Sequence, residues 1–120
     1  MHHPILSRSS HEWFVLEGGA EAELAVASHP APLVVLSGHT HESFQGRAGE
    51  AYLIGAPATY YSIRHDGPRF EFDLSRFGAA VVTLDDERFE PTVDLVMLED
   101  ETMRGEDHLH LAVLDLPGGP

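Results

Sequence analysis

Residues 33–44, LVVLSGHTHESF, form the stretch that decides how the fold of this chain is interpreted. Four apolar residues at 33–36 run through Gly38 into two histidines spaced two apart, His39 and His41. A short apolar run that stops at glycine is typical of a fully buried strand ending at a turn. Loops at such strand ends hold the ligands of open α/β sheets. Two imidazoles there can converge on one cation, so the stretch predicts a metal site.

A second histidine motif opens the chain, where His2 and His3 precede Pro4 in MHHPIL. Pro4 biases the residue before it away from helix and toward extended backbone. The residues between this motif and His39 leave room for one helix and one strand. The two motifs together favour a shared site over two unrelated pairs of histidines.

Taken together, these motifs resemble those of the calcineurin-like metallophosphoesterases. GHTH at residues 38–41 looks like the last metal-ligand motif of that family, and MHHPIL is similar to its preceding H-x-P motif, in the form of the cyclic-nucleotide phosphodiesterase branch. The resemblance implies an α/β fold, the C-terminal half of a two-sheet α/β sandwich that is strand-rich after residue 50. Residues 1–98 would be a partial phosphoesterase domain, and residues 99–120 an acidic C-terminal extension that could carry one further strand.

For the site, the resemblance implies that His2, His39 and His41 are metal ligands, whereas His3 has no clear ligand role. The complete family site holds two transition-metal ions, which lower the pKa of a shared water and clamp the phosphoryl oxygens. Imidazole suits Mn, Fe and Zn, so the identity of the metal stays open. The implied activity is hydrolysis of a phosphomonoester or phosphodiester, with a nucleotide as one possible substrate.

Several motifs of that family are missing from this chain. D-x-H and G-D-x-x-D do not occur, and G-N-H-[DE] cannot, because the sequence has no asparagine. These motifs supply the carboxylate that bridges the two metals and the histidine that protonates the leaving group. The hydrolase assignment is therefore uncertain for this chain, which we expect to be inactive alone. Three histidines could still hold one metal with an open position.

Three interpretations follow. The chain is the C-terminal part of a metal-dependent phosphoesterase, which we favour; a non-catalytic or split-partner metal-binding module; or an unrelated small acidic β-rich binding protein with incidental histidines. Outside the family, the terminal amine and His3 could chelate Cu or Ni. An unpaired apolar edge beside residues 33–37 would favour the first two interpretations. The first also predicts self-association or marginal stability unless the N-terminal half is supplied.

Composition limits the function classes. The chain has 120 residues, 42% of them hydrophobic, which suits one small domain. Its net charge is −13, with seven arginines and no lysine, so nucleic-acid polymers and anionic membranes are repelled. No cysteine is present to form a disulfide. Neither a membrane span nor a signal peptide is recognisable, and the expected location is cytoplasmic.

The remaining pattern predicts one helix and a run of strands. The helix covers residues 20–28, with Leu24 facing a sheet. The strands cover 33–37, 51–54, 60–64, 70–74, 77–84, 92–98 and 110–116, with turns at 45–50, 65–68 and 85–91.

Other charged or basic side chains have plainer explanations. Arg64 and Arg69 could meet a phosphate, although exposed arginines beside acidic residues are commoner. His108 and His110 share one face if extended, which is more often a polar strand edge than a metal site.

Overall fold

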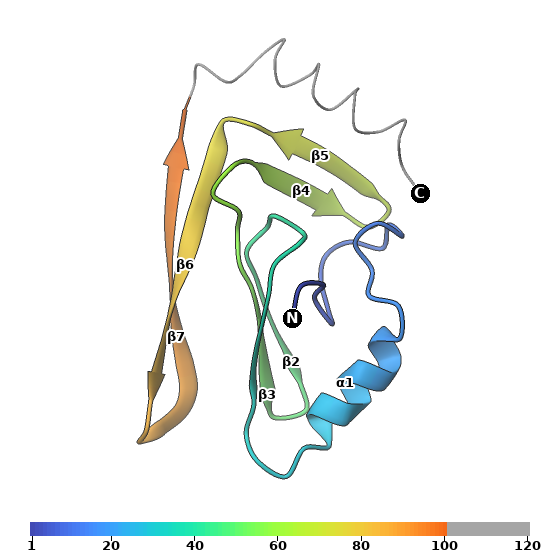
Figure 1. Cartoon of the computed structure of the whole chain (residues 1–120), viewed down its shortest axis with the longest axis vertical. Coiled ribbons are helices and arrows are strands. Elements are labelled where there is room, and N and C mark those ends of the chain that lie inside the picture. The colour runs from blue at the N-terminus through green and yellow to red at the C-terminus, as the bar shows by residue number, and fades with distance from the viewer. Residues whose placement is uncertain (101–120) are drawn as a thin grey trace.

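The computed structural model describes residues 1–100 (Figure 1). The elements in chain order are α1 (Gly19–Ala27), β1 (Val34–Ser37), β2 (Phe44–Ala48), β3 (Ala51–Gly55), β4 (Ser62–Asp66), β5 (Arg69–Asp73), β6 (Arg76–Asp85) and β7 (Arg88–Glu99). The strands form three small sheets, with the orders β1-β3-β2, β4-β5 and β6-β7. The fold is therefore a strand-rich α/β type, and it is flat, measuring 50 × 30 × 18 Å. Within the described part, no helix is both long and apolar enough to cross a membrane.

The central sheet combines a parallel and an antiparallel pairing. β3 runs parallel to β1 and antiparallel to β2, and Gly49–Glu50 make the two-residue turn between β2 and β3. The predicted turn over residues 45–50 is therefore wrong for most of its length. Gly46, read as a turn signal, lies inside β2, where a Cβ atom would come 2.9 Å from the ring of Phe44. The glycine makes room for that ring rather than breaking the strand.

The strand β1 lies at an edge of this sheet. Within residues 1–100 it pairs with β3 alone, and Leu36 on it is 49% exposed. The prediction of a fully buried strand is wrong here, because no described layer covers that edge. Only its carboxyl end has further partners: the amino group of Met1 donates to the carbonyl of Leu36 at 2.8 Å, and the N–H of Gly38 donates to that of His2 at 3.0 Å. The apolar edge named above is thus present, and the N-terminal segment pairs with its carboxyl end.

A buried apolar cluster joins the β4–β5 hairpin to the N-terminal segment. Phe14, Ile63 and Phe72 are buried there, each with 5% exposure or less. A hydrogen bond at the hairpin turn holds the N-terminal segment beside this cluster: the N–H of Ser10 donates to the carbonyl of Gly67 at 2.8 Å. Gly67 adopts φ +60°, the left-handed conformation that favours glycine in a two-residue hairpin.

The helix α1 packs less closely on the sheet than predicted. It lies beside β2, but none of its residues is buried, and Leu24 is 68% exposed instead of packing on a sheet. Its contact is made through small side chains, since a Cβ atom at Gly49 would lie 3.1 Å from that of Ala27. The expected helix is confirmed, and its expected packing is not.

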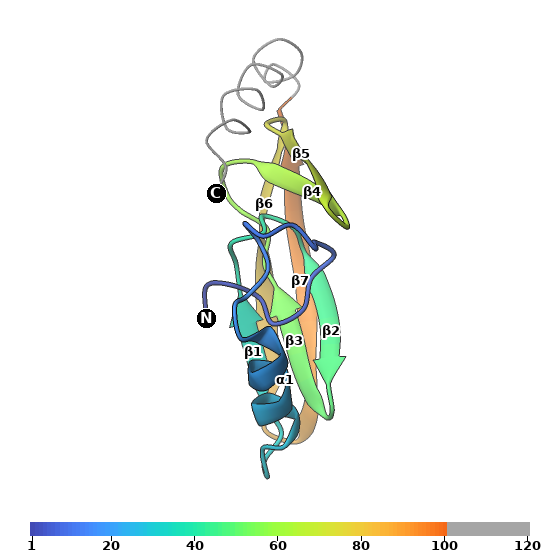
Figure 2. The ribbon, with the colours of Figure 1, turned by 90° about the vertical axis from the view of Figure 1, so that its right-hand side faces the viewer.

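The long hairpin β6–β7 lies alongside the central sheet, on the side away from α1 (Figures 1 and 2). The expected strand at 77–84 is confirmed within β6, whereas β7 begins at Arg88 instead of 92, so Asp86–Glu87 are the whole turn. Pro91 is tolerated because a two-stranded ribbon leaves every residue on an edge. The predicted strand at 110–116, His108, His110 and most of the acidic extension lie outside the described residues.

We predict that Gly78→Ala destabilises the β6–β7 hairpin. A Cβ atom at residue 78 would overlap the carbonyl oxygen of Val96 and lie 2.5 Å from the Sδ of Met97. Overpacking of this kind costs about 2 kcal/mol of unfolding free energy, measurable by denaturant titration. Gly38→Ala is the matched control, because nothing lies within 4 Å of its added carbon. Equal effects of the two substitutions would contradict the packing described here.

Candidate metal centre

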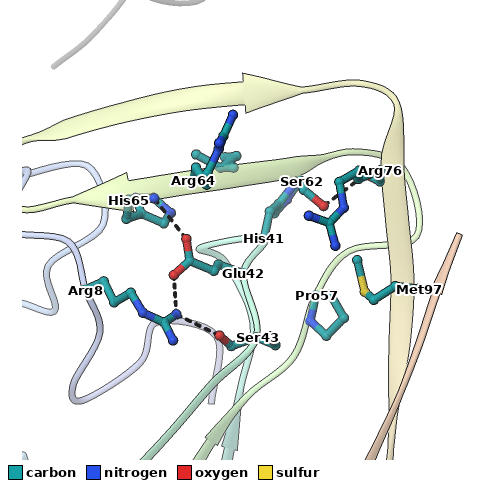
Figure 3. Close-up of a pocket in the computed structure, with 11 residues that line it drawn as sticks. Arg8, His41, Glu42, Ser43, Pro57, Ser62, Arg64, His65, Arg76 and Met97 are labelled. Carbon is teal, nitrogen blue, oxygen red and sulfur yellow. Dashed lines mark hydrogen bonds and ion pairs between the residues drawn. The ribbon is translucent and has the colours of Figure 1, made fainter. Parts of the chain in front are cut away.

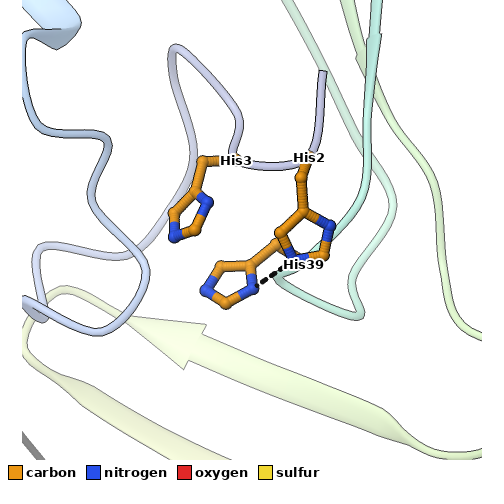
Figure 4. Close-up of side chains that lie close together, drawn as sticks. All are labelled: His2, His3 and His39. Atoms are coloured by element: carbon orange, nitrogen blue, oxygen red, sulfur yellow. Dashed lines mark hydrogen bonds between the residues drawn. The ribbon is translucent and has the colours of Figure 1, made fainter.

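Three histidines from two distant segments meet beside the carboxyl end of β1. The side chains of His2 and His3 point from the N-terminal segment toward His39, which follows β1 (Figure 4). Their ligand nitrogens all lie within 4.8 Å of one another. The Nδ1 of His39 is 2.9 Å from the Nε2 of His2, and the ring of His3 stacks on that of His39 at 3.9 Å between centroids. We call this group the histidine cluster.

Hydrogen bonds determine which nitrogen of His39 can bind a metal. Its Nε2 lies 2.7 Å from the carbonyl oxygen of Trp13, and a carbonyl only accepts, so Nε2 carries the proton. In the neutral ring, Nδ1 then has the free lone pair and faces the Nε2 of His2, which donates to it. A metal between these two nitrogens would replace that proton. Backbone carbonyls commonly orient metal-binding imidazoles in this way.

His41 lies outside the histidine cluster but close to it. Its Nδ1 donates to the carbonyl of Tyr61 at 3.0 Å, which leaves the lone pair on Nε2. Burial lowers the pKa of His41, as do the nearby His39, His2 and His65, while the bond to Tyr61 partly offsets the shift. A neutral imidazole with Nε2 free is the form that binds a metal.

The same effects act on His3. Burial lowers its pKa first, followed by the neighbouring His39 and His2. Both effects favour the neutral form of His3, which is the form that binds a cation.

The loop that carries His39 and His41 has an uncommon backbone. These are the two non-glycine residues with positive φ within residues 1–100, at 63° and 52°. Left-handed conformations of non-glycine residues are uncommon and concentrate at functional sites, where surrounding contacts over-determine them. Between the two histidines, Thr40 is 2% exposed, and its N–H donates to the carbonyl of Gly38 at 2.7 Å.

His65 on β4 fixes this loop from the other side. Its Nε2 donates to the carbonyl of Thr40 at 2.7 Å, and its backbone N–H donates to Glu42 at 2.9 Å. Glu42 also accepts from Arg8, as Figure 3 shows. His65 is 7% exposed, and its Nδ1 has no partner within the described residues. A buried nitrogen without a partner is unfavourable. The hydrogen bond from His65 to the Thr40 carbonyl therefore explains the position of this histidine better than packing in the core does.

The donor set fits one metal ion better than two. Three imidazoles can bind a single zinc-like ion with an open fourth position. The 2.9 Å between the nitrogens of His2 and His39 is slightly less than the ~3.3 Å expected between two ligands of a tetrahedral ion, so a small separation suffices. No carboxylate from residues 1–100 joins the group, and the bridge that a metal pair needs is not supplied there.

The sequence prediction overlaps this geometry in part. His2 and His39, both predicted as ligands, lie together; His3, which had no predicted role, lies with them, and His41 bonds separately to Tyr61. His65 was missed because H-D-G-P reads as a turn, whereas residue 65 lies within β4. The spacing of His65 two residues after Ile63 would place both on one face of a strand, but no local motif extends that strand past residue 64.

Comparison with known proteins does not assign the chain to a family. The chain matches no protein-family model, and a search among curated proteins finds no match. The site is therefore interpreted from its own geometry.

We predict that His65 acts on metal affinity through Thr40. His65→Leu removes the donor to the Thr40 carbonyl and should weaken Zn²⁺ binding about 10- to 100-fold, the usual effect of losing an orienting partner. His65→Gln keeps a comparable donor and should stay within about threefold, by the same reasoning. Competition titration with a chelator measures both, and unfolding of the metal-free variants reports stability separately. Wild-type affinity in the Leu variant would refute this role.

The lowered pKa values of His3 and His41 predict a pH dependence of stability. Because folding lowers them below the usual 6.5, the unfolded chain takes up protons first as the pH falls. The unfolding free energy should therefore be constant above about pH 6.5 and decrease below it. Thermal unfolding of metal-free protein at pH 5.5 and 7.5 tests this, with a His3→Gln, His41→Gln variant as comparison. An equal decrease in that variant would contradict the assignment.

Proposed function

We propose that this chain carries one metal-binding part of a metal-dependent phosphoesterase site, with His2, His39 and His41 among the ligands and His3 as an added one. The observation that carries the proposal is the GHTH loop itself. It follows the edge strand β1, holds two histidines in left-handed backbone, and brings His39 within 2.9 Å of His2. A transition metal such as Zn, Mn or Fe, when bound, would lower the pKa of water and polarise a phosphoryl oxygen.

The protein's own residues do the positioning. Trp13 and Tyr61 orient the two imidazoles of the loop through backbone carbonyls, and His65 fixes the peptide between them. These contacts give the ligands one tautomer each, so little reorganisation accompanies metal binding.

The open edge of β1 supports a two-sheet sandwich that is completed from outside the described residues. Leu36 is half exposed there, and the one strand that pairs with β1 within residues 1–100 is β3. Exposed strand edges of this kind bind another strand. Ligands with carboxylate or amide oxygens would then come from the same source, either a further segment or a second chain.

A second candidate function is a non-catalytic metal-binding module. The specific observation that favours it is the all-histidine donor set, which lacks a carboxylate within residues 1–100. Both candidates predict metal binding, and they differ in whether added ligands produce turnover.

The decisive experiment is a metal titration combined with a phosphodiester assay. We expect the wild-type chain to bind about one Zn²⁺ or Mn²⁺ per chain, as a three-imidazole site does, with no turnover of a chromogenic phosphodiester. His39→Ala, which removes the central ligand, should lose binding at least about tenfold. His29→Ala is the matched control, because the side chain of His29 is exposed and bonds to Ala31 beyond the end of α1.

Two outcomes would overturn parts of this proposal. Equal metal binding by wild type and His39→Ala would remove the metal site. Turnover by the wild-type chain alone would show that the missing carboxylate and amide ligands are not required.

A further inference from the structure

Within residues 1–100, the strand β7 offers an open hydrogen-bonding edge, because it pairs with β6 alone. On β6, the N–H of Gly78 donates to the carbonyl of Ala58 at 2.8 Å, so it points away from β7. Main-chain groups alternate in direction along an antiparallel pair, so those of Met97, opposite Gly78, also point out of the hairpin. The same holds for Val93 and Leu95, and this side of β7 can therefore pair with a further strand.

Pro91 limits the length of this edge. It has no N–H to donate and shares the outward direction of Val93, so a strand that pairs here must stop at residue 92. Beyond that point the side chains are apolar on both faces of β7. Leu95 is 45% exposed on one face, and Val96 is 53% exposed on the other. Apolar side chains on both faces are typical of a strand inside a larger sheet.

The sequence after β7 contains a segment that fits this edge. Residues 109–116, LHLAVLDL, lie outside the described residues, and the mostly polar residues 100–108 connect them to β7. Apolar residues dominate both alternating sets of the segment, as they do in β7. The segment equals residues 92–99 in length, and Pro117 ends it as Pro91 ends the edge. In an antiparallel arrangement the two prolines would lie at the same end.

A second copy of the chain is a less suitable occupant of the same edge. Each chain carries a net charge of −13, and charge of this size keeps copies apart. A segment tethered through residues 100–108, by contrast, has an effective concentration of about 1 mM at β7. Charge and tethering therefore both favour the chain's own residues 109–116.

We propose that residues 109–116 bind the open edge of β7 as an antiparallel strand, with Val113 opposite Leu95 and Ala112 opposite Val96. In this register apolar side chains meet on both faces of the sheet, the unit that stabilises strand pairs. Met97 on the same edge lines a cavity of about 330 Å³ together with His41, so the added strand would support one wall beside the metal centre (Figure 3). The inference is independent of the proposed function, because the pairing needs no metal.

Disulfide trapping in the full chain, which has no cysteine of its own, tests the register. Val96→Cys with Ala112→Cys should link within one chain on air oxidation, because opposite Cα atoms of such a pair lie about 4.5 Å apart, within disulfide range. Val96→Cys with Val113→Cys is the matched control. Its second thiol is shifted by one residue onto the other face and should stay reduced. Non-reducing gel electrophoresis and thiol counting measure both, and circular dichroism of the reduced variants verifies folding.

A charge substitution tests the same contact without cysteines. Val113→Asp would place a carboxylate against Leu95 and should lower the melting temperature by several degrees, whereas Gly118→Asp adds the same charge beyond Pro117 and should not.

Three outcomes would overturn the inference. These are equal crosslinking of the two cysteine pairs, no link within the chain for residues 96 and 112, and an equal change in melting temperature for the two aspartate variants. Disulfides between chains would identify a second copy as the occupant instead. Loss of metal binding with the crosslink retained would affect only the proposed function.

Discussion

The left-handed backbone of His39 and His41 is the constraint on which the rest of this structure depends. Each residue is unfavourable there by itself, so the surroundings have to hold the loop. Trp13 and Tyr61 accept from the two imidazoles, and His65 donates to the peptide between them. Trp13 lies in the N-terminal segment, Tyr61 directly precedes β4, and His65 lies within β4. The hydrogen bonds between the N-terminal segment and the β4–β5 turn therefore stabilise the site as well as the core.

The described chain as a whole buries little apolar surface. Eight hydrophobic residues are buried, whereas eleven large ones are exposed, among them Leu24 on α1, Leu36 on β1 and Phe89 on β7. With a thickness of 18 Å, residues 1–100 leave little depth for a second packed layer over the central sheet, since packed sheets lie about 10 Å apart. Exposed apolar side chains next to an unpaired strand edge are typical of a surface that another segment covers. This supports the proposal that the sandwich is completed elsewhere.

Local pattern predicted most elements but not their packing. The helix at 20–28 and the strand at 51–54 follow from residue composition and from the glycines and prolines that bound them, and the structure confirms both. Gly46 was misread because a glycine inside a strand gives the same signal as one in a turn. The burial of 33–37 was overestimated because an apolar run does not reveal whether a second layer exists. Of the site, the approach of His39 to His2 was predictable by resemblance, while the role of His65 depends on a hairpin register that no local motif encodes.

The all-histidine donor set determines the charge that a bound cation would keep. Neutral imidazole ligands leave the full charge of a bound cation in place, whereas carboxylate ligands would neutralise it. In a chain with net charge −13, such a cation would be a local centre of positive charge. His41 extends this donor set, because its Nδ1 donates to the carbonyl of Tyr61 and leaves the lone pair of Nε2 for a metal.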